Sequence, residues 1–147
     1  MNFRQALRIG SLGVLTADQA PDVYKLLFLY AVDSIDCLPG PCNDYEYQEA
    51  DKTIDFLTYI VILIYLWGRI PEANPWWFRW LLLGSLVFRF IGLLQFQSTR
   101  DAKTLILFPD FFRELTIVGL MFPGNPWAIL AVFLIKPFVE VYLHDRK

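Results

Sequence analysis

The stretch Trp76–Phe96, WWFRWLLLGSLVFRFIGLLQF, decides how the rest of the chain is interpreted. It is long enough to cross the hydrocarbon core of a bilayer, which requires about 20 predominantly apolar residues. Arg89 lies well inside this apolar run. A cation inside a membrane helix is costly, and it normally faces the interior of a bundle, where a partner neutralises it. The stretch therefore predicts a transmembrane helix with one inward-facing cation.

The composition agrees with a membrane location. Hydrophobic residues make up 56% of the chain and charged residues only 19%, whereas soluble domains carry about 25% charged residues. This surplus of apolar surface must face lipid or a partner. The net charge of -2 provides no basic patch, so nucleic acid is excluded as a partner. The first residues lack the apolar core and cleavage site of a signal peptide, so we expect insertion through internal spans.

Three further apolar runs predict helices, and they are Ile54–Ile70, Leu105–Phe122 and Trp127–Leu143. The predicted fold is therefore an all-α membrane protein, a four-helix transmembrane bundle built as two hairpins, 54–96 and 105–143. Residues 1–53 are expected to form a separate N-terminal segment, interfacial or cytoplasmic, that ends in an acidic loop. Residues 54–147 form the bundle.

Within the N-terminal segment, apolar residues recur at helical spacing and predict a short surface helix: Phe3, Leu7, Gly10 and Val14, with Arg4 and Arg8 beside them. Val23–Leu38 is also expected to be helical. Lys25, Asp33 and Asp36 make it a poor spanning helix, so we expect it to lie at the membrane interface or to pack on the bundle. A fifth span is the alternative.

A tripeptide repeat links the two expected hairpins. Asn74-Pro75-Trp76 precedes the second apolar run, and Asn125-Pro126-Trp127 precedes the fourth. The repeat places both turns on the same side of the membrane. Alternatively, the tripeptide is simply good helix-start chemistry, since Asn caps, Pro suits the first turn and Trp favours the interface.

The repeat also predicts a partner for Arg89. Arg89 and Glu140 follow the Trp of their motifs by the same number of residues, so they would lie at similar depth and form an ion pair. Ser85 and Gly92 share the helix face of Arg89. Because small residues allow helices to approach closely, we expect this face to be the packing face.

The apolar runs contain a balanced set of charges, with three cations and three anions. The set consists of Arg89, Arg113, Lys136, Asp110, Glu114 and Glu140. One hypothesis is a proton or ion path, or a site for a polar ligand. The interpretation we favour is a mutually neutralised network that holds the helices together.

The distribution of cations predicts the orientation. The residues before Ile54, the loop 97–104 and the C-terminus hold most of the Lys and Arg. The positive-inside rule then places both termini in the cytoplasm or its equivalent, in a bacterial inner membrane or an organelle membrane. Five tryptophans are expected to anchor the opposite interface: Trp67, Trp76, Trp77, Trp80 and Trp127.

Cys37 and Cys42 flank a tight loop that a disulfide could close. A membrane thiol oxidoreductase is disfavoured, because the spacing is not C-x-x-C and no second pair could relay electrons. We expect free thiols or an incidental bridge. His144 is the only histidine, so a multi-histidine metal site is excluded, and we expect no metal or other cofactor.

No pattern of catalytic residues is present, so we do not expect an enzyme. The sequence predicts a small polytopic membrane protein that acts as a non-catalytic structural or accessory subunit. Its expected partners are the lipid bilayer and other membrane subunits or further copies of itself. The alternative is a homo-oligomeric channel or small transporter that uses the charged residues of its membrane helices.

Overall fold

A computed structural model describes residues 3–34 and 45–145, and all its regular elements are helices. This confirms the all-α prediction. The chain divides into two compact units, Met1–Tyr65 (unit 1) and Leu66–Lys147 (unit 2). The expected boundary between residues 53 and 54 falls inside a continuous helix, α3 (Tyr45–Leu66). The polar residues before Ile54 belong to this helix, so the change in composition does not mark a domain boundary.

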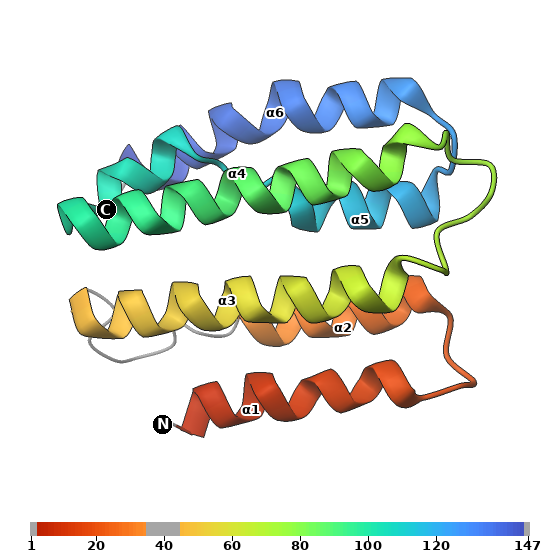
Figure 1. Cartoon of the computed structure of the whole chain (residues 1–147), viewed down its shortest axis with the longest axis horizontal. Helices are drawn as coiled ribbons and strands as arrows, with labels where there is room; N and C mark the ends of the chain where they lie inside the picture. Colours follow the sequence, from red (N-terminus) through yellow and green to blue (C-terminus); the bar gives the residue numbers. More distant parts are fainter. Residues whose placement is uncertain (1–2, 35–44, 146–147) are drawn as a thin grey trace. The chain divides into compact units, whose positions relative to one another are not determined.

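Unit 1 contains α1 (Phe3–Ser11), the short 3-10 helix η1 (Leu12–Thr16), α2 (Asp22–Ser34) and α3 (Figure 1). The helix expected over Val23–Leu38 therefore begins at Asp22, directly after Pro21, which cannot donate a backbone hydrogen bond. Its first backbone hydrogen bonds run from Tyr24 and Lys25 to the carbonyl of Pro21. The buried apolar residues of unit 1 include Leu26, Leu29, Tyr30, Tyr59 and Ile62.

Unit 2 contains α4 (Trp77–Thr99), the 3-10 helix η3 (Ala102–Leu107), α5 (Phe112–Met121) and α6 (Pro126–Asp145). The chain reverses after α4, returns through η3 and α5, and reverses again into α6 (Figure 1). Side chains from α4 and α5 fill the core, including Phe78, Leu82, Phe96, Phe112 and Leu115.

The third apolar run is not one helix, as the sequence led us to expect. Leu105–Phe122 is divided between η3 and α5, and the residues 108–111 between them are not helical. Pro109 explains this break, because proline lacks a backbone N–H and disfavours a helical conformation in the residue before it. Phe108 accordingly has φ -123° and ψ 67°.

The expectation of four membrane-spanning helices is not supported. Among the described residues, only α4 is both long and apolar enough to cross a bilayer. The first half of α3 carries Glu46, Glu49, Asp51 and Lys52, and its last residue is Leu66 rather than Ile70. The ten residues of α5 rise about 15 Å, half the thickness of the hydrocarbon core.

The two Asn-Pro-Trp turns lie at the same end of unit 2, as the repeat predicts. The Asn74 side chain donates to the carbonyl of Gly119 at 2.8 Å and accepts from the Gly124 N–H at 3.0 Å, so it joins the turn before α4 to the turn before α6. Gly124 has a φ of +75°, and a Cβ there would lie 2.5 Å from the carbonyl oxygen of Ala73. The close contact between the turns therefore requires glycine at this position.

Gly92→Ala and Gly84→Ala should have opposite effects on stability, although both lie in α4. A Cβ on Gly92 would lie 2.5 Å from the Cβ of Phe108, whereas a Cβ on Gly84 meets nothing within 4 Å. We expect Gly92→Ala to destabilise the protein by about 1–3 kcal/mol through overpacking. Gly84→Ala should stabilise it by about 0.5–1 kcal/mol through helix propensity. Thermal unfolding followed by circular dichroism measures both, and equal shifts would contradict the packing of Gly92 on Phe108.

Candidate functional site

The break between η3 and α5 is held against α4 by Arg89. The Arg89 Nη1 donates to the carbonyl oxygen of Phe108 at 2.9 Å. A carbonyl at a break in a helix has no partner within that helix, and leaving it unsatisfied in an apolar environment is costly. Arg89 therefore satisfies the backbone at the position where Pro109 interrupts the helical hydrogen bonds.

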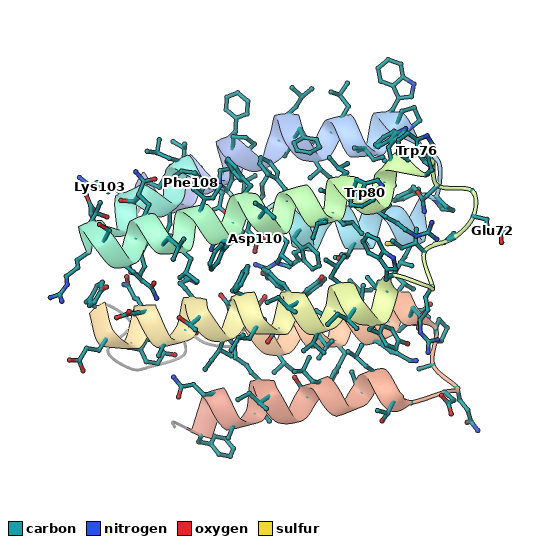
Figure 2. All side chains as sticks on the ribbon, viewed as in Figure 1. Glu72, Trp76, Trp80, Lys103, Phe108 and Asp110 are labelled. Atoms are coloured by element: carbon teal, nitrogen blue, oxygen red, sulfur yellow. The ribbon has the colours of Figure 1, made fainter. Side chains whose placement is uncertain are left out.

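Ser85 and Gly92, which the sequence predicts on the packing face of α4, are both buried. Gly92 lies directly against Phe108, and the Ser85 hydroxyl donates to the Leu82 carbonyl within its own helix at 2.7 Å. The ring of Phe108 also packs on that of Phe88, with centroids 5.0 Å apart. Figure 2 shows Phe108 beside α4. The small residues thus allow close approach of the η3–α5 break to α4.

The structure gives Arg89 and Glu140 different partners from those that the repeat predicts. Arg89 bonds to the Phe108 carbonyl, and Glu140 lies 3.4 Å from the ammonium of Lys136, one turn earlier in α6. Lys136 also donates to Glu114 of α5 at 2.7 Å. The prediction assumed that the second and fourth runs are equivalent, whereas Arg89 of α4 bonds to the break beside Pro109.

The contacts of four of the six charged residues fall into two sets. Lys136, Glu114 and Glu140 form a triad that joins α5 to α6. Arg89 acts separately on the break. Asp110 is buried within the break, and Arg113 is half-buried in the first turn of α5.

The tryptophans of unit 2 lie at one of its ends, together with Arg79. Trp76 and Trp80 lie at one end and Lys103 at the other (Figure 2). Trp80 packs edge-on against Trp67 at 6.0 Å, and the Arg79 Nε donates to the Trp67 carbonyl at 3.0 Å. The Asn74 hydrogen bonds bring Trp127 to the same end as Trp76. The tryptophans expected as interface anchors, including Trp77, are exposed.

Unit 1 contains a charge cluster that the sequence analysis missed, and Arg8 lies at its centre. Arg8 is only 6% exposed. Its guanidinium contacts the carboxylates of Asp33 and Asp51, and its Nη2 lies 3.0 Å from Asp55. Lys52 lies 3.3 Å from Asp51 and 3.4 Å from Asp55. Asp51 and Asp55 are four residues apart, which places both carboxylates on one helix face. This spacing was the sequence pattern that could have indicated a site for a buried cation.

The cluster adjoins a small cavity, of about 10 Å³, lined by residues that include Arg8, Ser11, Tyr30, Asp33 and Tyr59. This is about the space that a single water molecule occupies. A substrate pocket is far larger, typically about 300–1,000 Å³. The cavity therefore suits a water molecule between polar groups and not an organic substrate.

A second buried cation in unit 1 is Lys25, which is 4% exposed. Its ammonium donates to the Tyr65 hydroxyl at 2.9 Å, and that hydroxyl donates to Asp22 at 2.6 Å. The hydrogen bond with Tyr65 is the main cause that raises the pKa of Lys25 above its usual value of 10.5. Lys25 is therefore an ammonium at neutral pH and not a nucleophilic amine. The interactions of the Lys25 ammonium stabilise the fold fully at a pH below the pKa that Lys25 has in the unfolded chain. This stabilisation is lost as the pH rises through the higher pKa of Lys25 in the folded chain.

Cys37 and Cys42 lie outside the described residues, as does the side chain of His144. Within the described part of the chain, no three metal-ligating side chains of the His, Cys, Asp and Glu types gather in a possible metal site. The ion pairs of Arg8 and Lys136 each join different helices within one unit.

Arg8→Met should strongly destabilise unit 1, because it leaves three carboxylates close together without their central cation. Removing one partner of a buried ion pair costs about 3–5 kcal/mol. We expect Arg8→Lys to recover part of the loss, since an ammonium restores the charge but not the forked contact. Chemical unfolding followed by circular dichroism compares the two variants with the wild type. A loss below about 1 kcal/mol for Arg8→Met, the usual range for an exposed pair, would contradict the buried cluster.

Double-mutant cycles should distinguish the observed ion pair from the predicted one. Lys136→Met and Glu114→Gln should be coupled, by a few tenths to about 1.7 kcal/mol. Arg89→Leu and Glu140→Leu should be additive within about 0.5 kcal/mol, because these residues have separate partners. Unfolding free energies of the single and double variants supply both couplings. If only Arg89 and Glu140 were coupled, the predicted ion pair would be correct and the observed pair of Lys136 with Glu114 would be wrong.

No protein-family model, curated protein or solved structure matches this chain. Its function is therefore inferred from its own residues. Three features bear on that function: the internal ion pairs, the exposed apolar faces, and the position of the tryptophans at one end of unit 2.

Proposed function

We propose that this chain is an integral membrane protein in which α4 spans the bilayer, and that it serves as a non-catalytic structural or accessory subunit of a membrane assembly. One observation carries the membrane location. Only 33% of the apolar segment of α4 is buried. The core helix of a water-soluble domain is apolar because it is mostly buried, and this explanation does not fit α4.

The length of α4 supports the same proposal. Its 23 residues rise about 35 Å, enough to cross a hydrocarbon core of about 30 Å with some tilt. Val87, Ile91 and Leu94 are exposed along it, at spacings of four and three that place them on one face. Lipid would cover this surface.

The second helix of unit 2 with an exposed apolar face is α6. Leu130, Leu134 and Phe138 follow one another at spacings of four and are exposed, whereas Lys136 turns toward α5. This division suits a helix that contacts lipid on one side and protein on the other. The η3–α5 break is compatible with the same environment, because non-helical backbone at membrane depth is tolerated where it is buried in protein.

The ends of unit 2 suggest its orientation. Tryptophan favours membrane interfaces, and Lys and Arg favour the cytoplasmic side. The end with exposed Arg100 and Lys103 would therefore face the cytoplasm or its equivalent. Arg8, Lys25 and Lys52, which the sequence analysis also counted, are engaged in ion pairs within unit 1. The orientation thus rests on Arg100 and Lys103 at one end of unit 2, against Arg69 and Arg79 at the end that carries the tryptophans.

The accessory role is favoured over a channel by the use of the charges. Lys136 is positioned between two carboxylates, and Arg89 is bonded to backbone. Side chains committed to internal contacts stabilise helix packing, whereas a conducting path needs polar groups that exchange partners with the moving ion.

Ile91→Lys should reduce stable membrane insertion of the full chain. A lysine near the centre of a spanning helix costs about 2.5–3.5 kcal/mol. Ser98→Lys is the matched control, since Ser98 is exposed near the C-terminal end of the same helix. Extraction of expressing membranes with alkaline carbonate measures the inserted fraction. We expect wild type and Ser98→Lys to stay in the pellet, and release of the wild-type chain would refute the membrane location.

The accessory role has its own test. The wild-type chain, purified in a mild detergent, should be accompanied by other membrane proteins in fixed stoichiometry by mass spectrometry. In liposomes it should produce no ion flux alone. Purification as a homo-oligomer whose flux changes with Glu140→Gln would instead establish the channel.

A further inference from the structure

Unit 1 buries several charged side chains beside its apolar core, while many large apolar side chains are exposed. In soluble proteins, Lys, Arg and Asp are rarely buried, and large apolar side chains form the interior. Here Arg8 is 6% exposed, Lys25 is 4% exposed and Asp55 is 7% exposed. These residues interact with partners inside unit 1, as the contacts of Arg8 and Lys25 show. The charged groups are therefore directed toward the interior of the unit.

Large apolar side chains occupy much of the outer surface of the same three helices. Phe3 is 79% exposed on α1, Phe28 is 51% exposed on α2 and Ile64 is 73% exposed on α3. Others extend these positions along each helix, namely Leu7, Ile9, Tyr24, Leu27, Leu57 and Val61.

These side chains form stripes along the helices. Leu57, Val61 and Ile64 follow at spacings of four and three on α3, and Phe3 and Leu7 follow at a spacing of four on α1. In α2, and in α3 from Ile54 onward, none of the charged residues is exposed. The outward stripes of these two helices are therefore apolar without a charged interruption.

The ion pairs of Arg8 and Lys25 inside unit 1 are those expected of a protein surrounded by an apolar medium. Charged side chains at membrane depth face the bundle interior and pair with one another. Arg8 satisfies this condition with Asp33, Asp51 and Asp55, and Lys25 satisfies it with Tyr65 and Asp22. In water these charges would gain nothing from being buried, because exposed carboxylates and cations are already well solvated.

We propose that the outward stripes of α1, α2 and the second half of α3 lie against the hydrocarbon of a lipid bilayer. The proposal rests on the proposed membrane location of α4 and extends it to unit 1. Lipid fits better than a protein partner because the stripes belong to three different helices. Lipid requires outward faces without exposed charge, and the stripes of α2 and of α3 from Ile54 onward meet this requirement.

The depth of contact follows from α3. Its apolar part from Ile54 to Leu66 rises about 20 Å, less than the thickness of the hydrocarbon core. Glu46 is exposed in its first turn and marks the part of the helix that lies in water or among headgroups. Unit 1 is thus immersed over part of its length, and the N-terminal segment is not a cytoplasmic extension.

Site-directed spin labelling of the full chain tests this proposal. Single cysteines replace Phe28 or Ile64 in a Cys37→Ser, Cys42→Ser background, reconstituted in vesicles of phosphatidylcholine and phosphatidylglycerol. Asp18→Cys is the aqueous control, because Asp18 is exposed between η1 and α2. Val87→Cys on the exposed face of α4 is the lipid control. Collision rates with oxygen, which concentrates in lipid, and with a water-soluble nickel chelate are compared at each position.

We expect labels at both Phe28 and Ile64 to collide preferentially with oxygen, as the label at Val87 does, and the label at Asp18 to prefer the nickel chelate. If Val87 reports lipid while Phe28 and Ile64 both behave as Asp18 does, this inference fails and the membrane location of α4 stands. If all four labels prefer the nickel chelate, both proposals fail. Agreement between two positions on different helices guards against local disturbance by one label.

Discussion

The constraint on which this structure depends is that a polar group removed from water must find another polar group. The hydrogen bond from Arg89 to the Phe108 carbonyl is the clearest case. Pro109 interrupts the chain beside α4, and the guanidinium replaces the backbone partner that the interruption removes. Gly92 makes the bond possible, because a side chain at this position would keep Phe108 away from the helix.

The same constraint explains how each unit holds together. In unit 1, Arg8 brings carboxylates from α2 and α3 to α1. In unit 2, Lys136 of α6 binds Glu114 of α5. Each unit also buries apolar side chains, but many other large apolar side chains are exposed. In a bilayer such side chains gain little from packing inward, because lipid is as apolar as they are. Polar contacts and close packing then specify how the helices pair.

Several features could be predicted from the sequence because their causes are local. The apolar run of α4, the packing face marked by Ser85 and Gly92, and the start of α6 at Asn125-Pro126-Trp127 depend on neighbouring residues. The Asn125 side chain accepts from the backbone N–H groups of Trp127 and Ala128, as a helix cap does. The position of Pro109 also marked the interruption of the third run, although the sequence analysis treated that run as one span.

By itself, the sequence determined the helical class, the candidate span and the charges that had to be neutralised, because periodicity and composition express local preferences. Only the tertiary structure decided which partner each charged side chain contacts. Arg89 bonds to backbone and not to Glu140, and Arg8 is buried among carboxylates of other helices. A side chain's partner depends on how the helices pack across long separations in sequence, and small changes such as the break at Pro109 alter that packing. No local pattern carries this information.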